Sequence, residues 1–139
     1  MKQELDDESR AALVLYRISR AKETLKEAAV LSKNGFYNTA VTRLYYACYY
    51  ATEALLLKDH IQAQTHSGVK TMLAMHFVST GKIPVAIGKT LSTLYEKRQS
   101  SDYDDFIYCN QTDVDELTVK AVEFIQTIEN LRRNGQKLG

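Results

Sequence analysis

The chain has 139 residues, of which 45% are hydrophobic and 25% charged, a globular balance that excludes a disordered or low-complexity chain. This length suits one hydrophobic core, so we expect a single domain over residues 1–139. The 18 basic and 17 acidic side chains leave a net charge of +1. No global field therefore favours a nucleic acid or a membrane, and any polyanion site must be local.

Two helices are predicted in the first part of the chain. The first spans residues 8–33, where apolar residues recur at helical intervals and form a face of Ala11, Leu15, Ile18, Leu25 and Ala28. Asn34 and Gly35 end it, because glycine adopts the left-handed conformation that closes a helix. The second runs from about Tyr37 to Lys58, carries tyrosines on its flanks and buries Ala40, Leu44, Ala47, Cys48, Ala51 and Leu55.

A third helix follows the polar link of residues 59–64. Thr65 is its expected N-cap, because a threonine oxygen accepts a hydrogen bond from the first turn. Its expected apolar side is Val69, Met72, Leu73, His76 and Phe77, and Gly81 ends it. Pro84 suits the first turn of a fourth helix over residues 84–100. The inner face of that helix is expected to be Ile87, Leu91, Leu94 and Tyr95.

The last helix is expected to follow residues 100–111, which show no helical period. Thr112 resembles an N-cap, with Asp115 three residues further on. Its inward residues would be Val114, Leu117, Ala121, Phe124, Ile125, Ile128 and Leu131. In no stretch do apolar and polar residues alternate with a period of two, so strands are not expected. The prediction is an all-α fold, an antiparallel up-down four-helix bundle core with a fifth helix.

The N-terminus, the apolar stretches and the cysteines indicate the cellular compartment of the protein. The N-terminus is polar and acidic, where a signal peptide needs a basic start and an apolar run. No apolar stretch approaches the roughly 18 uncharged residues that cross a bilayer. Cys48 and Cys109 show neither CxxC nor metal-ligand spacing, and reduced thiols are the default in a cytosolic chain. We therefore expect a cytoplasmic protein.

Four motifs, in this order and spacing, resemble small stand-alone HEPN proteins of bacteria and archaea. They lie at residues 40–51 (AVxRLYYAxYYA), 65–69 (THSGV), 77–83 (FVxTGxI) and 94–103 (LYxxRQxxDY). The resemblance extends over about residues 10–132. It implies a four- or five-helix bundle that forms a homodimer. It also implies a gene often placed beside one for a minimal nucleotidyltransferase, with which the protein forms a toxin–antitoxin-like pair.

The resemblance also implies a site. Active HEPN relatives are metal-independent RNases that carry an arginine and, four to six residues later, a histidine, and two subunits bring these pairs together. The arginine matches Arg98, but the histidine positions hold Tyr103, Asp104 and Asp105. A histidine serves as acid or base near neutral pH, whereas aspartate is already ionised and tyrosine is mostly a hydrogen-bond donor. Arg98 would still hold a phosphate.

Our leading expectation is therefore a nucleotide-binding or interaction module, partnered with a minimal nucleotidyltransferase. One alternative is a divergent metal-independent endoribonuclease with Arg98, Asp102 and Tyr103 as catalytic residues; another is a helical adaptor without a ligand. Arg98 and Asp102 are also spaced for an intrahelical ion pair. Tyr103 is either a candidate acceptor for a nucleotide, as the resemblance implies, or an interface tyrosine with a satisfied hydroxyl.

Two further residues are candidate ligand-binding residues. His66 lies in the first turn of the third helix, where it either helps to bind a phosphate or acts as a capping or surface residue. Arg43 lies on a mostly apolar helix and needs an acidic partner if buried, which Glu53 or an acid among residues 102–105 would supply. The neighbouring tyrosines stack bases or, the favoured interpretation, pack in the core or at a dimer interface: Tyr45, Tyr46, Tyr49 and Tyr50.

No metal site or cofactor is predicted. His60 and His66 are six residues apart across a loop and His76 is distant, so zinc lacks both ligand spacing and ligand number. The acids at positions 102, 104 and 105 lack the positions of an EF-hand, which favours a solvated loop.

Overall fold

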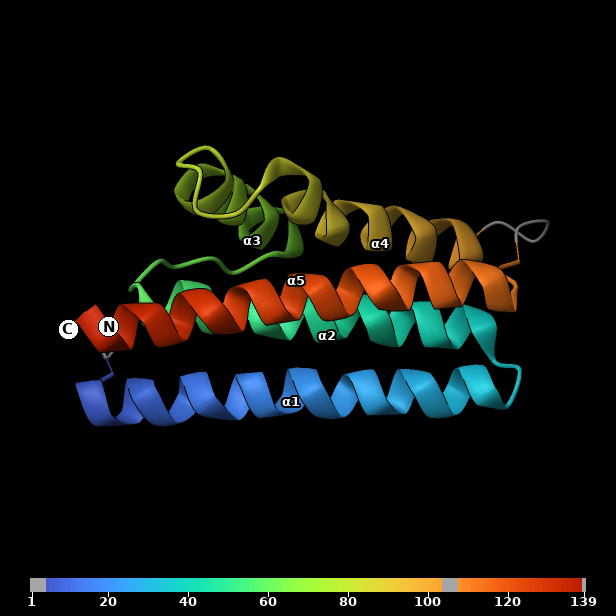
Figure 1. Cartoon of the computed structure of the whole chain (residues 1–139), viewed down its shortest axis with the longest axis horizontal. Helices are drawn as coiled ribbons and strands as arrows, with labels where there is room; N and C mark the ends of the chain where they lie inside the picture. The colour runs from blue at the N-terminus through green and yellow to red at the C-terminus, as the bar shows by residue number, and fades with distance from the viewer. Residues whose placement is uncertain (1–4, 104–107, 139) are drawn as a thin grey trace.

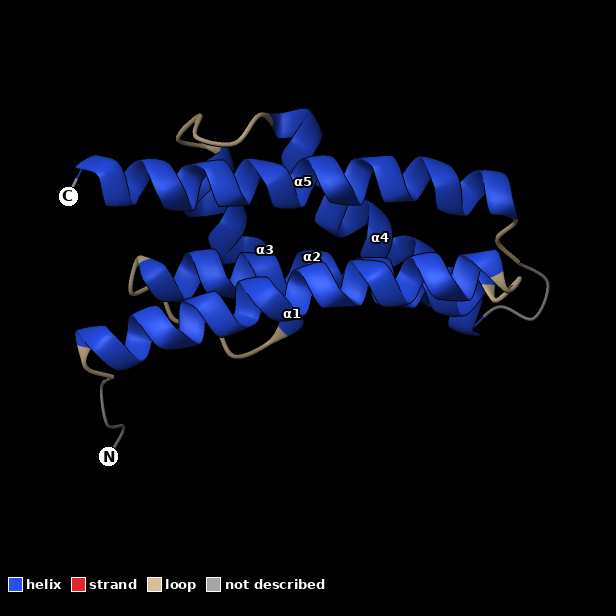
Figure 2. Cartoon of the chain, turned by 60° about the horizontal axis from the view of Figure 1, so that its bottom comes forward, coloured by secondary structure: helices blue, strands red, loops and turns tan. Residues whose placement is uncertain are grey.

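The computed structural model describes residues 5–103 and 108–138, and within these ranges every regular element is a helix (Figure 2). The side chains of residues 100–103 and 135–138 lie outside the description. The elements are α1 (Asp7–Lys33), α2 (Tyr37–Lys58), α3 (His66–Leu73), the π-helical turn η1 (Ala74–Val78), α4 (Val85–Tyr103) and α5 (Gln111–Leu138). The all-α prediction is confirmed.

The four long helices alternate in direction, as expected for an up-down bundle (Figure 1). α2 is the central helix, because it packs against α1, α4, α5 and α3. α1 lies along one side of α2, whereas α3 and α4 lie on the opposite side (Figure 1). The antiparallel bundle with an additional helix is therefore confirmed, and α3 is the short helix that lies beside the long ones.

The central place of α2 follows from its composition, since a helix that is apolar nearly all round is buried. Its buried residues include many alanines, which let neighbouring helices approach closely: Ala40, Val41, Leu44, Tyr45, Ala47, Cys48, Tyr49, Ala51, Thr52, Ala54, Leu55 and Leu56. α5 contributes the residues predicted for its inner face. Of these, Val114, Leu117, Ala121, Phe124, Ile125 and Ile128 are buried, and Leu131 is partly buried.

The predicted inner face of α1 is partly wrong. Ala11 is exposed and Leu15 is 54% exposed, whereas Ile18 and Ala28 are buried as expected. The buried stripe is Val14, Ile18, Ala21, Thr24 and Ala28. Two apolar stripes at helical spacing overlap in this sequence, and contact with α2 and α5 selects the one that contains Val14.

The third helix begins as predicted and then departs from the expected geometry. Thr65 is the N-cap, and its Oγ1 accepts a hydrogen bond from the Gly68 amide at 2.9 Å. The π turn η1 follows α3, with the Ser79 amide bonded to the Ala74 carbonyl. Phe77 is buried but His76 is exposed. The prediction that His76 lies on the apolar side is therefore wrong, whereas Phe77 is buried as predicted. The widened turn changes the register of the side chains that follow Leu73.

The boundaries of α4 and α5 differ from the prediction by a few residues. α4 begins at Val85, directly after Pro84, and continues to Tyr103 rather than ending at residue 100. α5 begins at Gln111, so Thr112 is not its cap. Asn110 Oδ1 accepts from the Asp113 amide at 2.9 Å, and Asp113 Oδ2 accepts from the Asn110 amide at 3.0 Å. This reciprocal pair is a capping box that starts two residues earlier than expected.

Candidate functional site

The centre of the candidate site is a group of aromatic rings on α2, here called the tyrosine cluster: Tyr45, Tyr46, Tyr49 and Tyr50. Residues three and four apart are neighbours on one side of a helix, which explains why Tyr49 meets Tyr45 and Tyr46 and why Tyr46 meets Tyr50. Tyr45 and Tyr49 are buried, whereas Tyr46 and Tyr50 are partly exposed. The cluster therefore has one inner edge, in the core, and one outer edge that solvent reaches.

His66, the first residue of α3, joins the inner edge of this cluster. Its Nδ1 lies 2.5 Å from the Tyr45 hydroxyl oxygen, and its ring stacks on that of Tyr49 with centroids 4.3 Å apart. The Thr65 cap starts the helix at this residue, and packing of α3 on α2 brings it to the tyrosines. His66 is thus neither the N-cap nor a free surface residue.

Arg98 reaches the same cluster from α4. Its guanidinium carbon lies 5.6 Å from the centroid of the Tyr45 ring and 5.3 Å from that of Tyr46. α4 is held here by Tyr95, whose ring meets Tyr45 edge to face at 5.6 Å and whose hydroxyl accepts from Gln99 Nε2 at 2.7 Å. Distances below about 6 Å are those of cation–π contacts, which fix the guanidinium against the rings.

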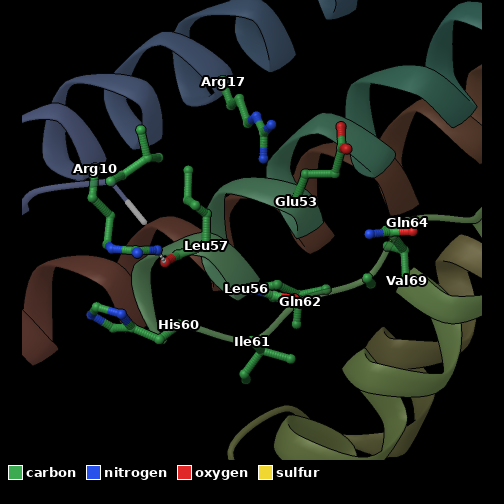
Figure 3. A pocket seen from close by; sticks show the side chains of 12 residues that line it. Arg10, Arg17, Glu53, Leu56, Leu57, His60, Ile61, Gln62, Gln64 and Val69 are labelled. Atoms are coloured by element: carbon green, nitrogen blue, oxygen red, sulfur yellow. Dashed lines mark hydrogen bonds between the residues drawn. The ribbon is translucent and has the colours of Figure 1, made fainter. Parts of the chain in front are cut away.

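Arg43 lies on the outer edge of the cluster. Its guanidinium carbon lies 5.2 Å from the Tyr46 centroid, and its Nη1 lies 3.8 Å from Glu27 Oε1 of α1. The acid beside Arg43 is thus Glu27 and not Glu53, which lies ten residues further along α2, a rise of about 15 Å. Glu53 interacts with Arg17 of α1 instead (Figure 3). Three of the residues predicted from the sequence, Arg43, His66 and Arg98, therefore surround one group of tyrosines.

The electrostatics of the cluster favour neutral inner groups. Burial, with a smaller contribution from the charge of Arg98, lowers the pKa of His66. Burial also raises the pKa of the Tyr45 hydroxyl well above its ordinary value. At neutral pH the pair is thus an uncharged imidazole bonded to an intact phenol. Such a pair exchanges donor and acceptor roles without creating a buried charge.

A cavity of about 210 Å³ lies between α2, α3 and α4, next to this pair. It is lined by Tyr45, His66, Ser67, Lys70, Leu91 and Tyr95. Its polar wall comes from His66, Ser67 and Lys70 of α3, and its apolar wall comes from α4. The imidazole of His66 is therefore accessible to a small polar group that enters from the side of Lys70.

The remaining predicted site residues lie on α4 beyond Arg98. The backbone of Asp102 and Tyr103 forms the last turn of this helix, so both follow Arg98 by about one turn. Their side chains, together with Asp104 and Asp105, lie outside the described residues, and so does the proposed ion pair between Arg98 and Asp102.

A second cavity, of about 490 Å³, lies between α1, the end of α2 and the link to α3 (Figure 3). Arg10 Nη1 donates to the Leu57 carbonyl at 2.9 Å and so satisfies the C-terminal end of α2 (Figure 3). Burial raises the pKa of Glu53, while Arg17 opposes this shift. His60 and Glu53 line this cavity, but none of the predicted ligand-binding or catalytic residues does.

Within residues 5–103 and 108–138, no three histidine, cysteine, aspartate or glutamate residues are grouped closely enough to hold a metal ion. None of the helices in the same ranges is long and apolar enough to cross a membrane.

The comparisons with known proteins agree with the all-helical fold. Residues 14–131 match the family model of the HEPN domain, so this chain belongs to the HEPN family. It is 35% identical over 119 residues to a "UPF0332 protein" of Thermotoga maritima, covering 86% of this chain and 90% of that relative. It is 33% identical over 108 residues to a "Putative toxin" of Methanocaldococcus jannaschii, covering 78% and 74%. The resemblance found in the sequence is confirmed.

The structure adds one relationship that the sequence analysis missed. Tyr45 and His66 are 21 residues apart on different helices, and neither motif points to the other. Sequence reasoning treated the tyrosines and the histidine as separate features. No pattern within a single chain signals a contact of this kind, because it depends on how α3 packs against α2.

Proposed function

We propose that this HEPN protein binds the phosphate of a nucleotide at Arg98 and works as a homodimer with a minimal nucleotidyltransferase, in a toxin–antitoxin-like pair. The observation that supports the phosphate site is the convergence of two guanidinium groups on one ring. Arg98 approaches Tyr46 from α4 and Arg43 approaches it from within α2. Two positive charges beside one partly exposed ring create a local positive potential that attracts an anion such as a phosphate.

The chemistry of the arginine fork suits this role. A guanidinium offers paired N–H donors that match two phosphate oxygens, and it remains charged at every physiological pH. Contact with Tyr45 and Tyr46 limits the rotamers of Arg98 before the ligand arrives, which lowers the entropy lost on binding. Membership of the HEPN family and the name of the Methanocaldococcus jannaschii relative, a putative toxin, support the pairing with a partner.

Nucleotide binding is tested by calorimetric titration of the purified chain with ATP. We expect Arg98→Ala to weaken binding by about tenfold or more, and Arg98→Lys to weaken it less, because lysine keeps the charge without the fork. Arg20→Ala is the matched control, since Arg20 lies 5.9 Å from the Tyr50 ring and also pairs with Glu23. Absence of ATP binding, or an equal loss of ATP affinity in Arg20→Ala, would contradict the phosphate site at Arg98. Either result would favour a helical adaptor without a ligand.

The partner is tested by co-expression with a nucleotidyltransferase encoded beside this gene, followed by size exclusion with light scattering. We expect a dimer of this chain that co-elutes with the partner. Mass spectrometry after incubation with ATP and the partner checks whether Tyr103 accepts a nucleotide, with the exposed Tyr108 as internal comparison. If this chain elutes as a monomer, separate from the nucleotidyltransferase, the proposed pairing is contradicted.

A second candidate function is a metal-independent endoribonuclease. As predicted from sequence, it would use Arg98 with Asp102 and Tyr103. No histidine follows Arg98 in the sequence, but His66 of α3 contacts Tyr45, the tyrosine that Arg98 also contacts. This proximity of a histidine to the arginine favours an enzyme. Incubation with structured RNA in EDTA, beside Arg98→Ala, tests this function. Intact RNA with both proteins, or equal cutting by both, contradicts it.

A further inference from the structure

We infer that the second cavity, between α1, the end of α2 and the link to α3, binds a small amphiphilic carboxylate, an acid with an apolar body and one negative charge. Arg10 and His60 hold the carboxylate in this arrangement, and the apolar body lies on Leu56 and Val69. The site is separate from the phosphate site proposed at Arg98, because neither Arg98 nor any residue of the tyrosine cluster is among the described residues that line this cavity.

The cavity has the size and the apolar lining of a small-molecule site. Its volume of about 490 Å³ lies within the range of roughly 300–1,000 Å³ that is usual for such sites. Leu56 of α2 and Val69 of α3 are buried and form its inner apolar surface. Leu57 and Ile61, which are partly buried, extend this surface toward the link (Figure 3). A hydrocarbon body therefore gains stability by leaving water for this surface.

Arg10 contributes a buried hydrogen-bond donor that lacks an acceptor. Its Nη1 donates to the Leu57 carbonyl at 2.9 Å, which holds the guanidinium at the end of α2 (Figure 3). Its Nε is buried and has no hydrogen-bond partner among the described residues. A buried N–H without an acceptor is unfavourable, and nearly all such groups in folded proteins are paired. A carboxylate would supply the acceptor, because its two oxygens match the fork that Nε and Nη2 form.

His60 lies at the same end of the cavity, in a backbone conformation that favours glycine. Its φ of 61° is in the left-handed region, where a Cβ is unfavourable. It follows the C-cap of α2, and the Ile61 amide closes the helix on the Leu56 carbonyl at 2.9 Å. The His60 amide donates to the Leu57 carbonyl at 3.1 Å, the carbonyl that Arg10 also contacts. A histidine here costs stability but places an imidazole N–H beside the guanidinium (Figure 3).

The charges that line the cavity favour an acid with a single negative charge. Arg10 and Arg17 bring two positive charges and Glu53 brings one negative charge, so with histidine counted as neutral the excess is 2 − 1 = +1. Arg17 lies near Glu53, because its charge opposes the rise in the pKa of Glu53 that burial causes. Arg10 lies seven residues, or about 10 Å of helix, from Arg17. A monoanion at Arg10 balances the excess, whereas a phosphate monoester, with a charge of about −1.5 to −2, exceeds it.

A ligand in this cavity would join three elements of the bundle. Arg10 belongs to α1, His60 follows α2, and Val69 belongs to α3. Residues 61–64, which connect α2 to α3, line the cavity as well. The unfolded chain has no such cavity, so binding stabilises the folded state by mass action. The melting temperature should therefore rise by about 5 °C or more when the acid is present at about 100 times its dissociation constant.

The experiment is a calorimetric titration of the full chain at pH 7 with two probe acids, hexanoate and 4-phenylbutyrate. We expect both acids to bind, and 4-phenylbutyramide, which has the same shape without the charge, to bind about tenfold more weakly or less. Arg10→Lys keeps a donor for the Leu57 carbonyl but loses the fork, so it should weaken the binding of both acids by about tenfold. Arg20→Lys is the matched control, since Arg20 belongs to the same helix but does not line the cavity, and should bind both acids as the wild type does.

Two further variants separate ligand binding from a structural role. His60→Gly removes the imidazole together with the unfavourable Cβ, so it should raise the melting temperature of the free protein. It should nevertheless weaken the binding of both acids by about fivefold, because one hydrogen bond to the carboxylate is lost. Glu53→Gln removes the negative charge that a bound carboxylate faces and should strengthen the binding of both acids by about threefold. The neutral amide should bind to Glu53→Gln and to the wild type alike.

Several outcomes would overturn the carboxylate site. They are failure of both acids to bind, equal binding of 4-phenylbutyrate and its amide, and equal affinities of Arg10→Lys and Arg20→Lys for the acids. Hexyl phosphate should bind more weakly than hexanoate, and tighter binding of the phosphate would refute the preference for a single negative charge. ATP titrated into the same preparation reports on the Arg98 site. If ATP binds and the acids do not, only the carboxylate site fails; if the acids bind in an Arg10-dependent way and ATP does not, only the phosphate site fails.

Discussion

Tyr49 and His66 are stacked face to face, with ring centroids 4.3 Å apart, so the first residue of α3 is fixed to the middle of α2. This contact joins an element of eight residues to the central helix of the bundle. The stacking contact is most stable when the imidazole is neutral, since a charged imidazole loses hydration free energy on a buried aromatic surface. The state of ionisation of His66 thus links the site to the stability of the fold.

The first prediction concerns this ionisation. Burial and the charge of Arg98 lower the pKa of His66 in the folded chain, whereas the unfolded chain has the ordinary value of about 6.5. As the pH falls below that value the unfolded state gains a proton that the folded state resists, so the free energy of unfolding decreases. Urea unfolding at a series of pH values should show a smaller decrease for His66→Gln than for the wild type. Parallel curves for the two proteins would contradict the lowered pKa.

The second prediction concerns Tyr46, which meets two guanidinium groups. Tyr46→Leu removes both cation–π contacts and should lower the free energy of unfolding by about 1–2 kcal/mol. ATP binding should weaken as well, because Arg98 loses one of the rings that hold it. Tyr46→Phe keeps the aromatic face and is the matched control. Urea unfolding and calorimetry check both effects, and equal behaviour of the two variants would show that the ring face has no role.

The third prediction concerns Glu129 of α5, which is only 3% exposed. Its carboxylate lies 3.3 Å from a nitrogen of Arg132, 3.3 Å from Arg133 and 3.8 Å from Lys22 of α1. Glu129→Gln leaves the buried Arg132 without its counter-charge and should cost about 3 kcal/mol of unfolding free energy. Glu123→Gln, which changes an exposed acid on the same helix, should change stability by less than about 0.5 kcal/mol.

The fourth prediction concerns the approach of α4 to the π turn. A Cβ at Gly88 would lie 2.6 Å from Cγ2 of Val78, a stiff β-branched side chain. Gly88→Ala should therefore destabilise the fold by about 1 kcal/mol, although alanine favours helices by a similar amount. In a Val78→Ala background the clash is gone, so Gly88→Ala should become stabilising. Chemical denaturation of the four proteins measures this reversal, and an unchanged sign would contradict the close approach.

The fifth prediction tests the start of α5. Asn110→Ala removes one half of the capping box with Asp113 and should cost about 1 kcal/mol. Thr112→Ala changes the cap that the sequence predicted and should cost much less, since Thr112 lies inside the helix. Thermal unfolding of both variants compares the two positions. A larger loss in Thr112→Ala would place the cap where the sequence analysis did.

Sequence periodicity was sufficient for the bundle but not for its details. The bounds of α2 and the Thr65 cap were predicted because local patterns determine them. The exposed Leu15 was not predicted, because two apolar stripes of α1 compete and only packing decides between them. The position of His76 depends on the π turn, for which no reliable sequence pattern is known. The cap of α5 was placed too late because an Asn–Asp box lacks the usual threonine and glutamate.

The site shows the same division. Arg98, Arg43 and His66 were each singled out by their residue type and position, and the structure brings all three to the tyrosine cluster. Their common meeting point was not predictable, because it combines three contacts between different helices. Of the acids considered as partners for Arg43, Glu53 is excluded because Glu27 of α1 takes this place, a contact that depends on how α1 packs against α2. The acids among residues 102–105 lie outside the described side chains.

The short helix α3 also separates two properties of the protein. Arg98 is carried by a helix that packs on both α2 and α5, whereas His66 is carried by an element that packs on α2, α4 and the π turn and not on α5. A partner protein that pulls α3 away from α2 would withdraw the imidazole and leave the guanidinium in place. The cation–π contacts that hold Arg98 would persist in that case, because Tyr45 and Tyr46 both belong to α2.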